Sequence, residues 1–477
     1  MDGSIPNENS TLYEGPINIS KPTVLRARAF HPSLDPSTIT TQSYMMNLYH
    51  SLPIVSLAMD PHELFNMEDG IFQPGPNVDK SGGIPFKNTI YRQYGKRRRP
   101  CHVEIFEKDG TKILDQDCEA GLQGQFSLDM PQKTLKFRSK SKYGKKYFES
   151  ELFPNRDFDQ YKSFVLRNSG NDNVWTRLAD LFQATMADQL DTTVLIQAGR
   201  PVVLYINGDY WGHYNFRERI DRWFVAQHEG LPLSEANNMD IVEANRKAFY
   251  GSNAEFTELK KTAEKLNTRD NPEDLKYLTD RIDVINYFDY LAIEMFYGNS
   301  DPGNTRCYKL KEEGSKWRWI LFDIDYGLFN SDFNSPKSYL KPSGSGQQNI
   351  PNILIRKLLE NDSMKDLFLQ RFGIVFKKFT TEYMLDELQK LIDEIEPEMV
   401  FHFNRWAEFN DKAINFDSPT NPEGAMSYWK VRINRLRNVI KKRPHILWGY
   451  IQEEFKLSDQ QMLEYFGPRP VMPEDAS

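Results

Sequence analysis

Residues 317–327 read Trp317-Arg318-Trp319-Ile320-Leu321-Phe322-Asp323-Ile324-Asp325-Tyr326-Gly327, an apolar strand pattern that ends in two closely spaced acids. In an extended strand, side chains at positions i and i+2 point to the same face. We therefore expect Asp323 and Asp325 to lie side by side. Carboxylates so close repel each other unless a cation lies between them, and Mg²⁺ prefers carboxylate and phosphate oxygens. The alternative is that one Asp caps the next turn while the other pairs with an arginine.

A second polar segment, Tyr297-Gly298-Asn299-Ser300-Asp301-Pro302-Gly303-Asn304, follows a strongly apolar helical pattern. A glycine is typical of the position just beyond a helix C-terminus. Asp301 and Asn304 are therefore expected on a tight loop that leads into a strand. Because strands at 305–311 and 317–324 should form a short pair, Asp301 and Asp325 are expected near each other. The alternative is a turn whose Asx residues serve the backbone alone.

A basic run occupies residues 131–146 and contains no acid. Its seven basic residues are Lys133, Lys136, Arg138, Lys140, Lys142, Lys145 and Lys146. A glycine-containing turn at 121–127, with Gly124 at its centre, precedes the run. A glycine turn followed by a lysine on a strand is one way to hold a polyphosphate. The alternative is a solvated basic face.

Turn signals and hydrophobic periodicity divide the chain into regions and predict an α+β fold. Residues 1–48 are expected to be a partial β module, 49–215 a β-rich lobe, 216–460 a helical lobe and 461–477 a tail. The β-rich lobe should contain one helix at 173–190. The helical lobe should contain helices at 217–229, 255–266, 282–297, 351–375, 380–397 and 426–452. An Asn207-Gly208 hairpin leads toward Glu218 at the junction of the lobes.

Another hairpin is predicted at Asp109-Gly110, because Asp-Gly is a strong two-residue turn signal. Folding about this turn places Phe106 opposite Ile113 and Cys101 opposite Cys118. The two cysteines could then form a cross-strand disulfide or remain as two half-buried thiols. The spacing of the three cysteines in the chain does not suggest a zinc site.

Composition excludes several classes of protein. The 477 residues are 39% apolar, 13% aromatic and 27% charged, which is typical of a folded chain of two or three domains. The net charge of −7 gives no reason to expect nucleic-acid binding. No apolar run approaches the ~18 residues of a membrane span. No signal peptide is visible, although a mature exported domain would look the same.

The glycine turn, lysine strand, helix, hairpin, Asp…Asn loop and Asp-Tyr-Gly segment follow the order of parts in kinase-type phosphoryl transfer. The chain resembles the CotH kinase family of atypical secreted or surface protein kinases, related to spore coat protein H, over about residues 50–450. The segments that carry the resemblance are 52–57 (LPIVSL), 99–104 (RPCHVE) with 109–110, 132–137 (QKTLKF), 166–172 (LRNSGND), 206–212 (INGDYWG) with Glu218, 298–301 (GNSD) and 319–325 (WILFDID). Residues 10–48 more weakly resemble the β module at the C-terminus of chitobiase and hexosaminidase enzymes.

This resemblance implies a bilobal protein-kinase-like fold and Mg²⁺- or Mn²⁺-dependent transfer of the ATP γ-phosphate to Ser/Thr of an exported or surface protein. It implies that the chain itself is secreted, periplasmic or on the cell surface. Asp301 would be the catalytic base, Asn304 and Asp325 metal ligands, and Asp323 a second ligand or a support. The nucleotide would be bound by Lys136, with Lys133 as the second choice, and by Gly124, Asp180 and Glu218. Asp180 would hold the phosphate-binding lysine.

Two other functions remain open at this point. A non-catalytic kinase-like scaffold could serve cell-surface adhesion or bind a surface glycan through the N-terminal module. An aspartyl-phosphate phosphatase would use the segment 322–327 (FDIDYG) as its nucleophile motif, but it needs a parallel α/β sheet after the motif, where this sequence has a polar loop and helices. Residues 329–348 are expected to be that loop, either a substrate or activation loop or an ordinary surface loop.

Overall fold

The computed structural model describes residues 2–46, 50–82, 85–93, 97–244, 246–301, 303–342, 352–412 and 418–473. They form a mixed α and β chain that divides into two compact units. The barrel unit comprises Met1–Arg177, Gly199–Arg219 and Ile392–Lys430, and the helical unit comprises Leu178–Ala198, Ile220–Leu391 and Val431–Ser477. The contiguous domain boundaries expected from the sequence, and the bilobal kinase-like layout, stay predictions.

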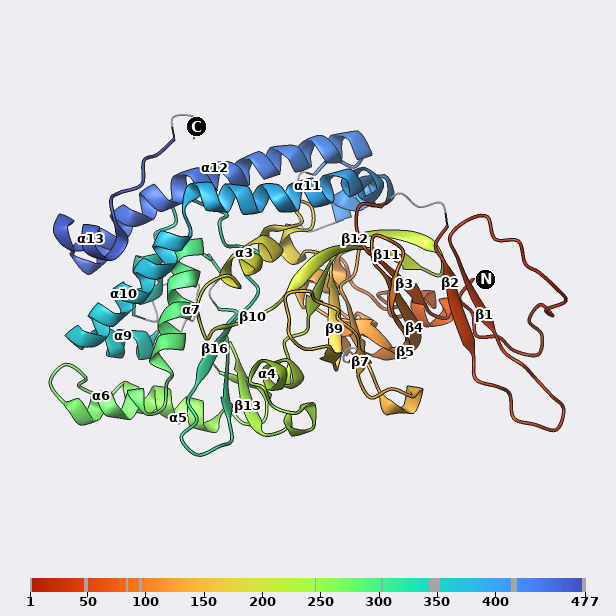
Figure 1. Ribbon diagram of the computed structural model, residues 1–477, viewed down its shortest axis with the longest axis horizontal. Helices are drawn as coiled ribbons and strands as arrows, with labels where there is room; N and C mark the ends of the chain where they lie inside the picture. Colours follow the sequence, from red (N-terminus) through yellow and green to blue (C-terminus); the bar gives the residue numbers. More distant parts are fainter. Residues whose placement is uncertain are drawn as a thin grey trace. The chain divides into compact units, whose positions relative to one another are not determined.

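The barrel unit is built on a closed barrel of seven strands in the order β11-β12-β9-β6-β5-β4-β3 (Figure 1). Along the chain the strands are β3 (Ile54–Ala58), β4 (Arg98–Phe106), β5 (Lys112–Leu122), β6 (Leu135–Arg138), β9 (Ser163–Arg167), β11 (Gly199–Ile206) and β12 (Asp209–Glu218). Neighbouring strands are antiparallel except β11 and β3, whose parallel pairing closes the barrel.

The two faces of the barrel differ in chemistry because directly paired residues share a face and successive residues alternate. Val55, Ile105 and Leu114 form one paired row, and all three are buried among the apolar side chains inside the barrel. The adjacent row carries Glu104 and Asp115 on the outer face. The hydrophobic interior therefore fixes which polar side chains point outward.

The β4–β5 hairpin confirms part of the predicted register. Cys101 lies opposite Cys118, as expected, with the two Sγ atoms 3.4 Å apart. Both cysteines are buried free thiols, and burial raises the pKa of Cys118. The expected pairing of Phe106 with Ile113 is wrong: a register shift after residue 105 places Phe106 opposite Lys112. A bulge of one residue produces this kind of shift without disturbing the rest of the ladder.

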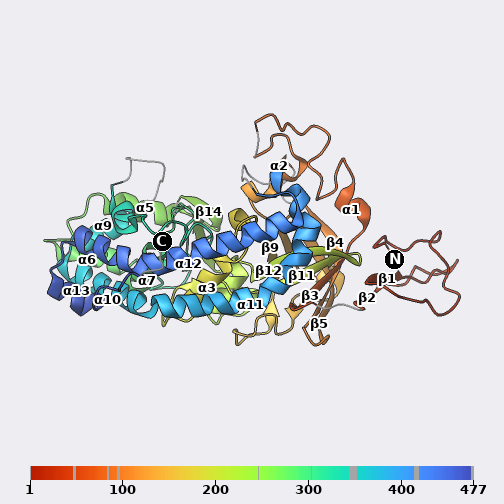
Figure 2. The same ribbon diagram turned by 90° about the horizontal axis from the view of Figure 1, so that it is seen from above.

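A two-stranded N-terminal module lies on the outside of the barrel within the same unit. Its strands β1 (Thr23–Ala27) and β2 (Thr40–Tyr44) pair antiparallel (Figure 2). The Ser43 hydroxyl of β2 is 2.7 Å from the Ser56 hydroxyl of β3. The other α-helices and strands that lie wholly in this unit are α1 (Pro61–Phe65), α2 (Ile90–Gln93), β7 (Phe148–Glu149) and β8 (Gln160–Tyr161).

The helical unit contains a five-stranded sheet in the order β10-β16-β15-β13-β14. Its strands are β10 (Leu195–Ile196), β13 (Met239–Glu243), β14 (Lys247–Tyr250), β15 (Arg306–Leu310) and β16 (Arg318–Leu321). Helix α7 (Val284–Tyr297) contacts β16 and lies beside α10 (Asp362–Lys378) (Figures 1 and 2). The other helices are α3 (Ala179–Ala187), α4 (Arg222–His228), α5 (Ala254–Ala263), α6 (Pro272–Thr279), α8 (Ser335–Leu340), α9 (Ile353–Leu359) and α13 (Asp459–Phe466), with α11 (Thr381–Trp406) and α12 (Pro422–Phe455) shared with the barrel unit.

Several helix boundaries differ from the sequence prediction. Helix α3 begins at Ala179 instead of 173, because Arg177 has a positive φ of 64° that a helix does not accommodate. The helix expected at 351–375 is two helices, and the Asn361 side chain caps the second. Helices α6 and α13 were not predicted. Among the residues that the structure describes, no helix has the length and apolarity to cross a membrane.

A buried arginine ties the end of α7 to the following loops. Arg443 of α12 is fully buried, and burial lowers its pKa to about 10. Its guanidinium donates to the carbonyl oxygens of Met295 (2.8 Å), Phe296 (2.9 Å), Ser331 (3.0 Å) and Phe333 (2.7 Å) and to the Ser335 hydroxyl (2.6 Å). The C-terminal carbonyls of a helix lack partners within the helix, and Arg443 supplies donors for them.

Replacing this arginine should destabilise the helical unit strongly. In Arg443→Met the carbonyls of Met295 and Phe296 lose a charged donor inside the core, so the free energy of unfolding should fall by about 3 kcal/mol or more. Urea titration followed by tryptophan fluorescence measures the loss. Arg437→Met on the same helix is the matched control and should cost about 1 kcal/mol or less. Equal losses in the two variants would contradict the assignment of Arg443.

Candidate functional site

The loop after α7 owes its direction to a glycine. Gly298 adopts φ 62°, ψ 42°, a left-handed conformation that favours glycine, and its N–H bonds the carbonyl of Met295. A Cβ on Gly298 would lie 3.0 Å from a terminal nitrogen of Arg443. The chain therefore turns sharply at this residue, as the sequence predicted, and Asp301 and Asn304 follow on the loop.

Three of the predicted site residues meet around one amide group. The Asn304 Nδ2 donates to Asp301 Oδ2 at 3.0 Å and to Asp323 Oδ2 at 2.9 Å. The backbone N–H of Asp301 donates to Asn299 Oδ1 at 3.0 Å. The structure therefore brings Asp301, Asn304 and Asp323 together; we call these three residues the acid cluster.

Asp323 does not lie on an extended strand, so the expected i, i+2 geometry with Asp325 is wrong. Strand β16 ends at Leu321, and Asp323 has a positive φ of 59°. That conformation is uncommon for a residue with a Cβ and turns the chain out of the strand. Asp323 instead reaches the acid cluster through its hydrogen bond with Asn304.

Helix α3 holds the segment that carries Asp325. The Asp180 Oδ1 accepts a hydrogen bond from the backbone N–H of Ile324 at 3.2 Å, and the Gln183 Nε2 donates to the carbonyl of Ile324 at 2.9 Å. Gly327 packs so closely on Gln183 that a Cβ there would lie 2.0 Å from its side-chain oxygen. Asp325 is buried in this segment. Asp180, in the first turn of α3, therefore positions the Asp-Tyr-Gly segment. Its pairing with a lysine stays a prediction.

The charges of the acid cluster act on one another. Burial, and then the charge of Asp323, raise the pKa of Asp301. Burial is the main cause that raises the pKa of Tyr326. The negative charges of Asp325, Asp301 and Asp323 raise it further. The charges of Asp301 and Asp323 therefore act on Tyr326, the residue that follows Asp325 in the chain. A raised pKa in a polar cluster is common at functional sites.

A buried glutamate supports the loop from the last turn of α7. Glu294 is 2% exposed, and burial raises its pKa to about 7, against hydrogen bonds from Asn299, Tyr339 and Tyr290. The Tyr339 hydroxyl donates to Glu294 Oε2 at 3.0 Å and also contacts the Asn299 carbonyl at 3.1 Å. Tyr339 belongs to α8, within the predicted loop at 329–348, of which residues 343–348 lie outside the described residues. This part of the loop is a helix that supports the site.

The predicted phosphate-binding lysine lies on the outer face of the barrel in a basic row. Lys136 of β6 and Arg217 of β12 both pair with Val165 of β9, so their side chains share its face. Arg138 and Arg167 lie two residues along on β6 and β9 and share that face as well. Lys136 and Arg217 are buried, at 4% and 1% exposure. The positive charges of this basic row suit an anion such as a phosphate.

Glu218 points to the opposite face from Lys136. It pairs with Phe164 on the inner row, and its Oε2 accepts from Arg156 at 3.1 Å. Neighbouring strand residues alternate between faces, so Glu218 cannot share a site on the face of Arg217 and Lys136. Its expected role with the nucleotide has no support in the geometry of this unit.

The other predicted phosphate residues, Lys133 and Gly124, precede β6. The Lys133 Nζ donates to the carbonyl of Leu128 at 2.6 Å and lies 5.1 Å from the Tyr91 ring centroid. These contacts fix Lys133 as a structural link within the unit. Gly124 has φ 124°, and a Cβ there would meet the Ser127 hydroxyl at 2.3 Å, so this turn requires glycine.

Sequence reasoning missed the residues that hold the acid cluster in place. Arg443, Gln183 and Glu294 lie on helices and were not distinguishable from ordinary helix residues. A glutamate inside the strongly apolar pattern of α7 was the one available signal, because buried carboxylates are rare unless they have a partner.

The pKa of Asp301 should depend on Asp323. In Asp323→Asn the like charge is removed, so the pKa of Asp301 should fall toward its ordinary value while burial still holds it somewhat raised. Carbon-13 NMR titration of the aspartate carboxyl groups measures the change. Asp280→Asn, at an exposed position after α6, is the control and should leave Asp301 unchanged. An unchanged pKa in Asp323→Asn would show that the two carboxylates are not neighbours in solution.

The pKa of Glu294 predicts a pH-dependent contribution to stability. Its folded-state pKa of about 7 exceeds the ordinary 4.5, so its stabilising effect is complete below about pH 4.5 and is lost as pH rises through 7. Glu294→Gln should therefore gain stability relative to the natural chain between pH 5 and pH 8, by about 1 to 3 kcal/mol. Urea unfolding of both proteins at the two pH values measures this difference. If the difference in the free energy of unfolding between the two proteins were the same at both pH values, the raised pKa of Glu294 would be contradicted.

Comparison with known protein families agrees with these features. A family model described as CotH kinase protein matches residues 121–447, which is more than half of the chain, and one described as Fn3 associated matches residues 1–44. No curated protein matched the chain. The match includes the basic row on the barrel and the whole acid cluster, and the resemblance seen in the sequence is confirmed. The chain therefore belongs to the CotH kinase family, with an Fn3-associated region at its N-terminus.

Proposed function

We propose that this protein is a Mg²⁺- or Mn²⁺-dependent protein kinase that transfers the γ-phosphate of ATP to Ser or Thr of an exported or surface protein. Family membership supports a kinase-like protein. The observation that carries the proposal is the acid cluster, in which Asn304 joins Asp301 to Asp323 within hydrogen-bond distance. Phosphoryl transfer needs little covalent chemistry from the protein, and such a cluster can supply the positioning and the metal ligands.

Asp301 is the best candidate for the base that orients the substrate hydroxyl. It is half-buried, and burial together with the charge of Asp323 raises its pKa, which makes it a stronger proton acceptor than an ordinary aspartate. Asn304 fixes its carboxylate through Oδ2, which leaves Oδ1 to face a hydroxyl.

The acid cluster together with Asp325 has the donor chemistry of a Mg²⁺ site. Mg²⁺ and Mn²⁺ accept hard oxygen ligands. The acid cluster offers two carboxylates and one amide oxygen, and Asp325 offers a third carboxylate. In the structure the Asn304 NH₂ group faces both carboxylates, so Asn304 would ligate a metal through Oδ1 after rotation of its amide. A bound metal would neutralise the nucleotide phosphates.

The phosphates of ATP are assigned to the basic row of the barrel, with Lys136 as the principal residue. Lys136 and Arg217 flank Val165 on one face, and both are buried, so their charges are screened less by solvent than those of exposed lysines. The exported substrate, the location of the chain outside the cytoplasm and a glycan-binding role of the N-terminal module rest on the family resemblance.

Transfer of labelled phosphate tests the proposal. The full chain is incubated with γ-labelled ATP and Mg²⁺ or Mn²⁺, and label in the chain and in a Ser-rich acceptor protein is measured. Asp301→Asn should reduce transfer by ~10²-fold or more, since general-base catalysis contributes factors of that size. Asp325→Asn and Lys136→Met should also reduce it, whereas Asp280→Asn should retain full activity.

The alternative scaffold function makes a different prediction. It requires that neither transfer nor thermal stabilisation by ATP with Mg²⁺ occurs in the natural chain. Full transfer by Asp301→Asn, with activity retained in the control, would remove Asp301 from its assigned role.

A further inference from the structure

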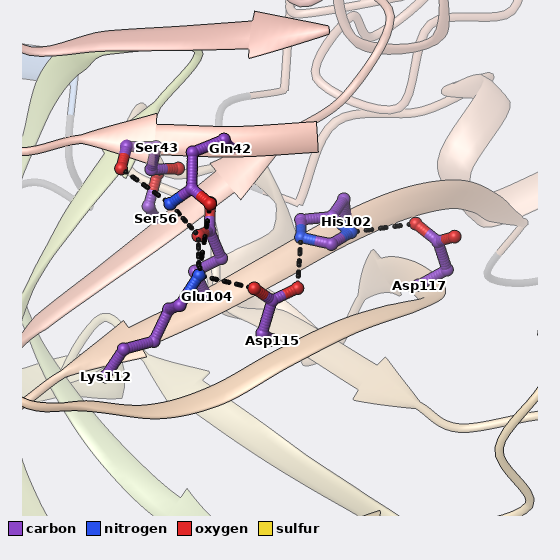
Figure 3. A network of polar contacts seen from close by, with 8 residues as sticks. All are labelled: Gln42, Ser43, Ser56, His102, Glu104, Lys112, Asp115 and Asp117. Atoms are coloured by element: carbon purple, nitrogen blue, oxygen red, sulfur yellow. Dashed lines mark hydrogen bonds and ion pairs between the residues drawn. The ribbon is translucent and has the colours of Figure 1, made fainter. Parts of the chain in front are cut away.

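A second polar cluster lies on the outer face of the β4–β5 hairpin, within the barrel unit (Figure 3). His102 and Glu104 of β4 lie directly opposite Asp117 and Asp115 of β5. One donor atom from each of His102, Glu104 and Asp115 can be chosen so that all three lie within 4.8 Å of one another. Because these residues share one face of a rigid ladder, the backbone brings them together without help from loops.

Two of these side chains, Glu104 and His102, are buried, and each has one polar atom that forms no hydrogen bond with the described residues. Glu104 is fully buried, and its Oε2 accepts no hydrogen bond from any residue that the structure describes. His102 is 7% exposed, and its Nε2 likewise forms no hydrogen bond with the described part of the chain, although Asp115 Oδ1 lies 3.1 Å away. A buried carboxylate oxygen without a partner is costly, and it indicates that something else binds there.

The other ring nitrogen of His102 has a well-formed partner. Its Nδ1 lies 2.8 Å from Asp117 Oδ1, and Figure 3 shows the two side chains pointing toward each other. When Nδ1–H donates to Asp117, Nε2 is the ring nitrogen that faces the carboxylate of Asp115. A histidine held by a carboxylate through one nitrogen, with the other nitrogen facing further acids, is the arrangement of a metal-ligating histidine.

The second oxygen of Glu104 is fixed by neighbours. Its Oε1 accepts from Gln42 Nε2 of the N-terminal module at 3.2 Å and from Lys112 Nζ at 2.9 Å. Lys112 also bonds Asp115. The ammonium group of Lys112 therefore lies where a cation is electrostatically favoured, and a metal would have to compete with it.

We propose that His102, Glu104 and Asp115 bind Zn²⁺ through Nε2, Oε2 and a carboxylate oxygen, with Asp117 orienting the histidine. One imidazole and two carboxylates suit Zn²⁺ better than Mg²⁺, which takes oxygen ligands. Tetrahedral Zn²⁺ places its ligand atoms about 3.4 Å apart. The exposed Asp115 side chain has the freedom to close the remaining gap while the buried ligands stay in place.

The site is structural and independent of phosphoryl transfer. Zn²⁺ would cross-link β4 to β5 directly below β2, since Gln42 already holds Glu104 from that strand. It would therefore stabilise the hairpin and the attachment of the N-terminal module to the barrel.

Zinc affinity of the full chain, measured by competition with a chromophoric chelator, tests the proposal. We expect saturable binding of one Zn²⁺, and Co²⁺ in its place should give the visible absorption of a nitrogen- and oxygen-ligated ion. Lys112→Met removes the competing ammonium and should bind Zn²⁺ about tenfold more tightly or better. Asp117→Asn should weaken binding by ~10- to 100-fold. Asp115→Asn and His102→Gln should abolish it, and His62→Gln, on exposed α1, is the control.

Two outcomes would overturn the proposal. One is that Lys112→Met binds Zn²⁺ no more tightly than the natural chain. The other is that Asp115→Asn binds Zn²⁺ equally well, which would mean that Asp115 is not a ligand. Both substituted side chains are partly exposed, so these variants should fold even where His102→Gln does not; circular dichroism verifies this.

Discussion

The side-chain amide of Asn304 lies between the carboxylates of Asp301 and Asp323, and neighbouring residues of the helical unit hold these three side chains in place. Asn304 Nδ2 bonds both Asp301 and Asp323 but brings no positive charge, and burial, followed by the charge of Asp323, raises the pKa of Asp301. A loop with such internal repulsion needs support from elsewhere. Arg443 supplies it at the end of α7, and Gln183 supplies it at Ile324.

Successive side chains along each barrel strand alternate between the inner face and the outer face, and this alternation separates the packing residues from the candidate binding residues. The inner rows of the barrel hold mainly apolar side chains, together with the thiols of Cys101 and Cys118, whereas its outer rows hold Lys136 and, on β4, Glu104. A register error of one residue would exchange the two sets, so burial of the inner rows strongly selects the observed register. The same alternation places Glu218 and Lys136 on opposite faces of the barrel, whereas the family resemblance implied a nucleotide-binding role for both.

Local signals predicted the parts of the fold that depend on local chemistry. The Asp109-Gly110 turn was sufficient to place Cys101 opposite Cys118, and the short β15–β16 connection was sufficient to bring Asp301 to the segment after β16. The bulge at Phe106 and the left-handed backbone of Asp323 could not be predicted, because no residue type there requires them.

Contacts between distant parts of the chain were also beyond the sequence. Arg443 bonds the carbonyl of Met295 across 148 positions, and its surroundings in α12 are ordinary for a basic helix. The polar cluster of the β4–β5 hairpin is a different case. The register that paired the cysteines also pairs His102 with Asp117 and Glu104 with Asp115, so the cluster was readable from the sequence once the turn was known.

The two acidic groups of this protein differ in how their charge is balanced, and this difference predicts different ions. The acid cluster is bridged by a neutral amide and offers oxygen donors alone, which favours a hard cation that arrives with phosphates. The hairpin cluster already contains the ammonium of Lys112, so only an ion that gains from imidazole coordination can displace it. Mg²⁺ gains little from a nitrogen ligand, whereas Zn²⁺ gains much. On the two proposals above, each site would take the ion that suits its own donor atoms.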